Sequence, residues 1–350
     1  MMQLQQRINA FVQLGAFLSQ FAEDTPTENP SVPQNDPFFA DMQHTWQLAK
    51  SQNSWFTDEN LQYACKSWGE ALTASNILAW LSDYKIPDAT SEKRIAVVMA
   101  GNIPLVGFHD FMCVLLSGHS VLGKLSSNDK VLLPFLSSYL LAVEPGFADT
   151  IKLTTKKLED FDAVIATGSD NTALYFEHYF GKYPNIIRKN RNSVAILTGK
   201  ETPQQMEALA DDIFRYFGLG CRNVSKIYVP ETYDWDHFFN GMFAWKDVIN
   251  NHKYINNYDY NKAVYLMSLE KLLDNEFMIL KEDTGFSSPI SVVFYEKYDS
   301  IDTLTSTLNA AREKIQCIVS EKHIPFGEAQ EPKLSDYADG VDTMKFLLDL

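Results

Sequence analysis

The sequence predicts an α/β protein with a Rossmann-like, doubly wound parallel sheet and a second α/β domain. Short apolar runs alternate with helical stretches from residue 94 onward, the rhythm of strands joined by crossover helices. These runs are apolar throughout, as expected when both faces of a sheet are covered. The 350 residues suffice for about two domains at roughly 100–200 residues each.

Residues 1–90 are predicted to form a helical region ahead of the sheet. Apolar residues recur at steps of three or four between Leu4 and Phe21, which is the spacing of an amphipathic helix. A proline-rich loop at 24–37 precedes two more helical runs, at about 40–51 and 57–83. Their tryptophans are expected to pack in the core and between helices, although the helices could also shape a pocket for an apolar substrate.

The first sheet is expected within a dinucleotide-binding domain at 91–200. Its strands are predicted at 95–100, 120–125, 150–154, 162–169 and 193–197, and its helices at 104–117, 129–142 and 170–180. A helix at 202–217 begins at Thr202-Pro203 and ends before Gly218. This helix begins a predicted catalytic domain at 201–322. A tail at 323–350 follows; as far as residue 343 it is rich in Gly, Pro and Asp and is expected to be an ordered loop.

The net charge of −15 disfavours nucleic acid or an anionic membrane surface as the main partner, but not an anionic cofactor held by helix ends. The four cysteines form no metal-binding spacing, so no metal is expected and free thiols in a reducing cytoplasm are predicted. We find no signal peptide core and no apolar run of about 18 residues, so neither secretion nor a membrane span is expected.

Cys221 is the candidate nucleophile. It lies in the glycine-flanked run 216–223, between a predicted helix and the strand-like segment 224–230. Glycine lets backbone N–H groups turn toward a substrate. The alternative is that Cys221 is a small buried hydrophobic residue, which is the common state of a lone cysteine. The other three cysteines are expected to be buried, because they lie in apolar periodic segments: Cys65, Cys113 and Cys317.

Other candidate residues follow the predicted strands. No G-x-G-x-x-G motif follows the first strand, but Gly168-Ser169 precedes a helix and could hold pyrophosphate, although such turns are common. Lys124 ends a strand, where it could meet a ribose or phosphate or simply be solvated. The amide of Asn102 could stabilise an oxyanion, or Asn102 could serve turn geometry.

Together these segments resemble the aldehyde dehydrogenase superfamily. More closely, the chain is similar to the acyl-CoA reductases related to the fatty-acid reductase of bacterial luminescence. Residues 1–90 carry no motif of the superfamily. The matching segments, in the order of the family, are Asn102-Ile103-Pro104, Lys124-Leu125-Ser126-Ser127 for Lys-Pro-Ser-Glu, Thr167-Gly168-Ser169, Cys221, the segment 282–289 for Glu-Glu-x-Phe-Gly-Pro, and Pro325-Phe326-Gly327.

Two departures from the family pattern bear on the chemistry. Hydrolytic members carry a Glu-Leu-Gly-Gly segment whose Glu activates water, whereas the corresponding residues here, 188–193, include no carboxylate. The resemblance therefore implies acyl exchange with a thiol and reduction rather than hydrolysis. Ser127 replaces the Glu that engages the adenosine ribose in the family. This removes a charge that would repel a 2′-phosphate, so NADP is the expected cofactor, with NAD as the alternative.

The resemblance implies an NAD(P)H-dependent reductase that converts an acyl-CoA or another acyl thioester into an aldehyde. It makes Cys221 the nucleophile and Asn102 the oxyanion donor. The implied cofactor residues are Lys124, Ser127, Gly168, Ser169, and Glu282 or Asp283, whose register stays open. Two alternatives remain: an acyl-phosphate reductase with phosphate bound at 188–193, and a non-catalytic scaffold that keeps the fold. The acyl chain and the oligomeric state stay open, a homo-oligomer being one option.

Overall fold

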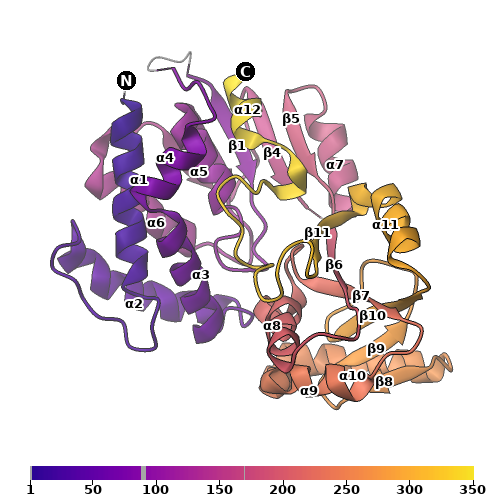
Figure 1. Ribbon diagram of the computed structural model, residues 1–350. Helices are drawn as coiled ribbons and strands as arrows, with labels where there is room; N and C mark the ends of the chain where they lie inside the picture. Colours follow the sequence, from indigo (N-terminus) through magenta and orange to yellow (C-terminus); the bar gives the residue numbers. More distant parts are fainter. Residues whose placement is uncertain (1, 88–91, 169) are drawn as a thin grey trace. The chain divides into compact units, whose positions relative to one another are not determined.

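The computed structural model describes residues 2–87, 92–168 and 170–350. The chain forms two compact units: Met1–Lys189 with Lys333–Leu350, and Asn190–Pro332. Each unit contains its own largely parallel sheet (Figure 1). The predicted α/β class is confirmed.

The sheet of unit 1 is parallel throughout, with the strand order β3-β2-β1-β4-β5. Its strands are β1 (Arg94–Val98), β2 (Ser120–Lys124), β3 (Ile151–Thr154), β4 (Ala163–Thr167) and β5 (Asn185–Arg188). The chain builds outward from β1 to β3 and then returns to place β4 on the other side of β1. The order therefore reverses between β1 and β4, which is the doubly wound arrangement that the sequence predicts.

Both faces of this sheet are covered by helices. Ile95 and Val97 of β1 face the large core that includes α5 (Phe108–Ser117) and α6 (Leu132–Val143). Ala96, between them in the chain, faces the opposite way and joins a smaller cluster with Phe176 and Phe180 of α7 (Asp170–Phe180). Alternate residues of one strand thus enter two different cores, which explains why the strands are apolar throughout.

The N-terminal helices belong to unit 1 and are not a separate region. They are α1 (Leu4–Ser19), α2 (Asn35–Gln52), α3 (Asp58–Ala71) and α4 (Ala74–Leu81). Phe11, Leu14 and Phe17 of α1 are fully buried in the core that also takes in β1 and α5. The buried Arg7 donates hydrogen bonds to the carbonyls of Leu115 and Leu116, so that a cation meets the negative end of α5.

Residues 333–350, within the predicted tail, return to unit 1. They include the short 3₁₀ helix η5 (Ala338–Gly340) and α12 (Thr343–Leu348), of which Met344 and Leu347 are buried in the core. Trp80 Nε1 donates to the Tyr337 hydroxyl over 2.8 Å. The predicted tail is therefore divided, because 323–332 stays with unit 2.

Unit 2 contains a six-stranded sheet with the order β11-β6-β7-β10-β9-β8, in which only the β8–β9 pair is antiparallel. Its strands are β6 (Asn192–Ile196), β7 (Val224–Pro230), β8 (Leu272–Asp274), β9 (Ile279–Glu282), β10 (Val292–Tyr298) and β11 (Ile315–Val319). Its α-helices are α8 (Pro203–Phe214), α9 (Trp235–Met242), α10 (His252–Met267) and α11 (Ile301–Ala310). Among the residues that the structure describes, the other 3₁₀ helices are η1 (Pro145–Phe147) of unit 1 and η2 (Arg215–Gly218), η3 (Phe243–Asn250) and η4 (Arg312–Lys314) of unit 2.

One strand was predicted in the wrong sheet. The run 193–197 forms β6, which pairs with β7 and β11 of unit 2. The fifth strand of unit 1 is instead β5, in which only Ile186 and Arg188 are buried. An apolar run shows that a strand is buried but does not identify its partner, so the predicted boundary at residue 200 differs from the division after Lys189.

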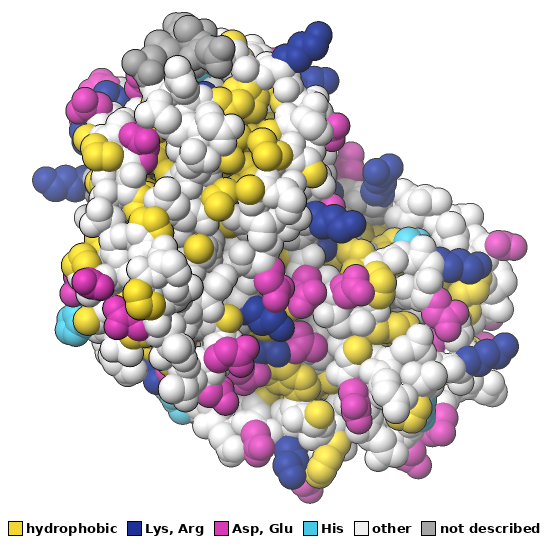
Figure 2. Space-filling model, turned by 60° about the vertical axis from the view of Figure 1, so that its left-hand side comes forward, with side chains coloured by type: hydrophobic (Ala, Val, Ile, Leu, Met, Phe, Trp, Pro, Cys, Tyr) yellow, Lys and Arg dark blue, Asp and Glu magenta, His cyan; other side chains and the backbone are white. Residues whose placement is uncertain are grey.

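Within the described ranges, none of the helices combines the length and the apolar character needed to cross a bilayer. The same residues contain no group of three or more His, Cys, Asp or Glu side chains that could hold a metal ion. On the face drawn in Figure 2, acidic and basic side chains lie near one another.

Candidate functional site

Three predicted residues lie at the carboxyl edge of the unit 1 sheet. Asn102 is in the loop after β1, Lys124 is the last residue of β2, and Gly168 follows β4. These strands are neighbours in the order β2-β1-β4 and run parallel, so their carboxyl ends share one edge. That edge includes the point between β1 and β4 where the strand order reverses, the usual ligand position in such sheets.

The loops after β1 and β2 pack directly against each other through Gly101. A Cβ added to Gly101 would lie 2.6 Å from Ser126 Oγ and 3.2 Å from the Asp129 nitrogen, so only glycine permits this approach. On its other side, the buried Asn53 donates to the Gly101 carbonyl over 3.0 Å. The half-buried Asn102 therefore follows a backbone position that is fixed from two directions.

The loop after β2 presents Ser127 to solvent in a tight turn between Ser126 and Asp129. Asp129 Oδ1 accepts hydrogen bonds of 3.2 Å from the Val131 and Leu132 amides and so holds the turn against the start of α6. Burial raises the pKa of Asp129. Lys124 is half-buried and donates to the carbonyl of Thr155, so it is not simply a solvated lysine.

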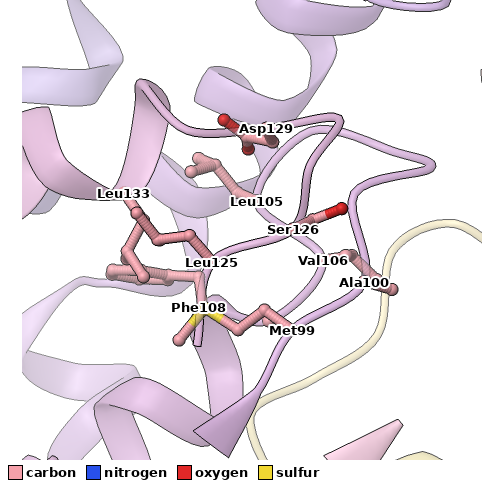
Figure 3. A pocket seen from close by; sticks show the side chains of 10 residues that line it. Met99, Ala100, Leu105, Val106, Phe108, Leu125, Ser126, Asp129 and Leu133 are labelled. Carbon is pink, nitrogen blue, oxygen red and sulfur yellow. The ribbon is translucent and has the colours of Figure 1, made fainter. Parts of the chain in front are cut away.

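A small apolar pocket lies behind these loops. Figure 3 shows Met99, Leu105, Phe108, Leu125 and Leu133 around it, together with Ser126 and Asp129. Its volume of about 10 Å³ corresponds to a single water molecule. The pocket therefore does not hold a nucleotide, and the loop surfaces in front of it form the candidate cofactor site.

Gly168 shapes the third part of this edge. A Cβ there would lie 2.9 Å from Thr172 Cγ2 and 3.0 Å from Phe176 Cε2, so the turn packs closely on the first turns of α7. A glycine turn that leads into a helix N-terminus offers backbone N–H groups to a phosphate. These features fit a dinucleotide. The predicted contact of Ser169 lies outside the described residues.

Cys221 is in unit 2, in the turn between η2 and β7, and its side chain is exposed. All four cysteines are among the described residues, and the other three are buried. Burial raises the pKa of Cys65 to about 12 and raises that of Cys113 well above its ordinary value. Cys221 is therefore the cysteine that a substrate can reach.

The turn before Cys221 is strained and braced. Tyr216 and Phe217 have left-handed backbones, with φ values of 55° and 59°, which costs on the order of 1–3 kcal/mol each for residues with a side chain. Asn223 holds this conformation, because its Nδ2 donates to the carbonyls of Asp212, Ile213 and Arg215 at 3.1, 3.3 and 2.8 Å. Such strain is typical of functional sites.

The turn is also fixed from the neighbouring strands. Ser193 of β6 donates to the Cys221 carbonyl over 2.9 Å, and its Oγ lies 2.9 Å from Cys317 Sγ of β11. The Gly220 amide donates to Asn223 Oδ1 over 2.8 Å. The Asn223 N–H in turn donates to the Gly220 carbonyl over 3.1 Å, so the peptide groups on both sides of Cys221 are held in place.

The predicted segment 325–327 lies close to the Cys221 turn. The buried Asp212 of α8 accepts hydrogen bonds from the Gly327 and Ala329 amides at 2.7 and 2.9 Å. Arg222 donates from Nε to the Ala329 carbonyl. Burial raises the pKa of Asp212 to about 7, although both amide hydrogen bonds favour its charged form.

The two acidic candidates at the end of β9 differ in their surroundings. Asp283 lies 2.6 Å from Lys281 Nζ and accepts from the Gly285 amide at 2.8 Å, and these contacts lower its pKa. Glu282 is exposed, and its Oε2 accepts a long hydrogen bond of 3.4 Å from the Tyr295 hydroxyl. Glu282 is therefore the more available of the two.

Arg188, at the start of the segment 188–193, is committed to an internal ion pair. Its side chain is buried, NH1 and NH2 contact both carboxylate oxygens of Asp110, and NH2 lies 3.0 Å from Thr343 Oγ1. Burial disfavours the charged carboxylate, but Arg188 holds the pKa of Asp110 below its ordinary value. Arg188 therefore does not offer its charge to a phosphate.

The residues 83–240 match the family model of the acyl-CoA reductases (LuxC). Over this segment the chain is similar to the LuxC acyl-CoA reductases, and its fold is that of the aldehyde dehydrogenases. The match includes Asn102, Lys124, Gly168 and Cys221 but ends before Glu282. No curated protein matches the sequence.

Solved structures, aldehyde dehydrogenases among them, share the fold of this chain at low identity. Aldehyde dehydrogenase 21 of Physcomitrella patens is 13% identical with a TM-score of 0.66, over 99% of this chain and 84% of that one. The P. syringae indole-3-acetaldehyde dehydrogenase AldA, solved with NAD⁺, is 13% identical with a TM-score of 0.61, over 87% and 69%. An NADP-dependent enzyme of E. coli is 11% identical with a TM-score of 0.58, over 91% and 78%.

Sequence reasoning missed the residues that brace the Cys221 turn: Ser193, Asp212 and Asn223. Ser193 is a polar residue inside an apolar run, and Asp212 is an acidic residue on the buried face of α8. A polar residue at a position where the pattern demands an apolar one was the available signal.

Proposed function

We propose that this protein reduces an acyl-CoA, or another acyl thioester, to an aldehyde with NADPH or NADH through a covalent thioester on Cys221. One observation carries the proposal: the exposed thiol lies in a strained and braced turn within the segment that matches the acyl-CoA reductases. The family match and the structural similarity to aldehyde dehydrogenases both support an aldehyde-related oxidoreductase.

In the first step, Cys221 Sγ forms a bond to the acyl carbon, and the bond from that carbon to the sulfur of CoA breaks. The proton lost by Cys221 leaves with the CoA thiol. Asn102 Nδ2 and the backbone N–H of Cys221 are the proposed donors to the carbonyl oxygen, which becomes negatively charged in the tetrahedral intermediate.

In the second step, the thioester carbon on Cys221 accepts a hydride, and the resulting hemithioacetal anion collapses as its carbon–sulfur bond breaks, which releases the aldehyde and the Cys221 thiolate; a proton from water restores the thiol. A bound nicotinamide cofactor would supply that hydride. The protein's own residues would bind this cofactor. Glu282 is proposed to hydrogen-bond the nicotinamide ribose, because it is the more exposed of the two acidic candidates. The other proposed cofactor residues are Lys124, Ser127, Gly168 and Ser169.

The segment 188–193 supports transfer over hydrolysis, because it contains no carboxylate to activate water. The internal pairing of Arg188 with Asp110 also weighs against the acyl-phosphate alternative, since the buried guanidinium is occupied.

The proposal is tested with acyl-CoA substrates of several chain lengths. Without reduced cofactor, the protein should release CoA and gain one acyl group in intact mass, and NADPH should then release aldehyde. Turnover of an acyl phosphate but not of acyl-CoA would favour the reductase of acyl phosphates. Absence of both acylation and cofactor binding would favour the non-catalytic scaffold.

Asn102→Ala is expected to lower turnover by roughly 10²–10³-fold, the usual cost of one oxyanion donor. Cofactor affinity should stay near normal, because the side chain is assigned to the acyl oxygen. Single-turnover reduction and cofactor titration measure the two effects. A loss smaller than about threefold would make Asn102 a turn residue and nothing more.

Ser127→Glu is expected to shift cofactor preference toward NADH. Ser127 is exposed beside Lys124, and a carboxylate there would repel the 2′-phosphate of NADPH. The wild type should use NADPH at least as well as NADH. The ratio of kcat/KM for the two cofactors, in both proteins, decides. A wild type that strongly prefers NADH and does not respond to the substitution would mean that the adenosine ribose binds elsewhere.

A further inference from the structure

A lysine is buried on the strand that leaves the Cys221 turn. Lys226 of β7 is fully buried, and its Nζ lies 2.6 Å from Glu296 Oε2. The same Nζ lies 4.9 Å from the centroid of the Tyr228 ring and 5.1 Å from that of Phe286. Because a buried ammonium is costly unless it is paired, these contacts must be kept whenever the unit is folded.

Lys226 belongs to a row of side chains across the sheet of unit 2. Phe294 of β10 is in register with Lys226 on one side and with Lys281 of β9 on the other. Lys281 Nζ lies 5.6 Å from the Phe294 ring and 2.6 Å from Asp283 Oδ2. Two lysines thus flank one aromatic ring, and each is paired with a carboxylate on its own side.

The Gly285-Phe286 turn packs against this row of side chains and is hydrogen-bonded to β7. Ser225 Oγ donates to the Phe286 carbonyl over 2.7 Å, while Lys226 approaches the Phe286 ring. A Cβ added to Gly285 would lie 3.4 Å from the Phe294 ring, so the turn rests on that ring. Consecutive residues of β7 therefore hold the backbone and the side chain of Phe286.

We infer that Lys226 is a positioning residue that fixes the Gly285-Phe286 turn and, through it, the acidic end of β9. This inference rests on the proposed function, which assigns that end to the nicotinamide ribose. Lys226 lies on the same strand that begins at the Cys221 turn, so one strand sets both the nucleophile and the cofactor segment. Loss of the Lys226 ammonium group affects the reductive step and leaves acylation of Cys221 intact.

The first test needs no ligand. In Lys226→Met, hydrogen exchange at the amides of 283–287 should become about tenfold faster, as expected when a desolvated cation–π contact is lost. Methionine keeps the bulk, and Glu296 is sufficiently exposed to be hydrated. Lys262→Met is the matched control, because Lys262 also pairs with a carboxylate and a tyrosine, Asp274 and Tyr258, but away from the turn. It should leave these amides unchanged.

The second test separates the two chemical steps. Lys226→Met should raise the Kd for NADPH, measured by fluorescence titration, by about tenfold or more, because a displaced Glu282 loses its proposed hydrogen bond to the ribose and a hydrogen bond to a charged group is worth about that factor. The rate of Cys221 acylation by acyl-CoA, followed by intact mass, should change less than about twofold. Lys226→Arg should restore most of the cofactor affinity, and Lys262→Met should behave as the wild type.

The outcomes distinguish the inference from the proposed function. If the wild type is not acylated, the proposed function fails, while the exchange result still decides whether Lys226 positions the turn. Unchanged exchange at 283–287, or equal losses in acylation and cofactor binding, would overturn the inference. If Lys226→Met does not fold, Ser225→Ala removes the other contact to Phe286, the hydrogen bond to its carbonyl. This variant should show smaller changes of the same kind: faster exchange at 283–287 and weaker NADPH binding, with acylation unchanged.

Discussion

Cys221→Ala is expected to abolish both acyl labelling and aldehyde formation. The other cysteines are buried, so no second thiol takes over the attack on the thioester. Intact mass after incubation with acyl-CoA should show one acyl group on the wild type and none on the variant. Peptide mapping should place the wild-type adduct on Cys221.

Two controls sharpen this result. Cys65→Ala removes a buried thiol of unit 1 and should keep full labelling. Cys221→Ser should transfer the acyl group slowly at best, since a serine without a general base is a far weaker nucleophile. Full labelling of Cys221→Ala would reject the assignment of the nucleophile and, with it, the proposed mechanism.

Arg188→Met is expected to destabilise unit 1 by about 3–5 kcal/mol, because it leaves the Asp110 carboxylate buried without its partner. Urea unfolding, followed by hydrogen exchange at α5 and α12, measures the loss. The double variant with Asp110→Leu should recover much of it, since no buried charge remains. Equal losses in the single and double variants would mean that packing, not charge, dominates.

The same ion pair predicts an acid dependence. Because Arg188 lowers the pKa of Asp110 below 3.8 in the folded protein, the stabilisation is present above pH 3.8 and is lost as the pH falls through the folded value. In Arg188→Met, burial, the largest influence on Asp110, still raises its pKa, and only the weaker effects of His109 and Thr343 oppose it, so this variant should be relatively less destabilised in acid.

Local patterns in the sequence predicted local structure well. Thr202-Pro203 correctly indicated the start of α8, where Thr202 and Gln205 form a capping box. The positions of Asn102, Lys124 and Gly168 at one sheet edge also follow from three strand ends, because the carboxyl ends of parallel strands share an edge.

Pairings between distant segments could not be predicted. Nothing in the run 193–197 indicates that it pairs with β7 and β11, and nothing in residues 333–350 indicates that they cover α5. The hydrogen bonds from Asn223 depend on left-handed backbone at Tyr216 and Phe217, which neither residue type favours. The choice between Glu282 and Asp283 required knowing that Lys281 pairs with Asp283.

The return of residues 333–350 to unit 1 has a consequence for how the chain is made. Unit 2 interrupts unit 1 in the sequence, so during synthesis unit 2 has all its residues once Pro332 is added. Unit 1 must wait for α12, whose Met344 and Leu347 are buried in the core that contains α5. During that interval the part of unit 1 that has already been synthesised leaves the apolar surface that α12 covers open to solvent. Such a surface favours aggregation.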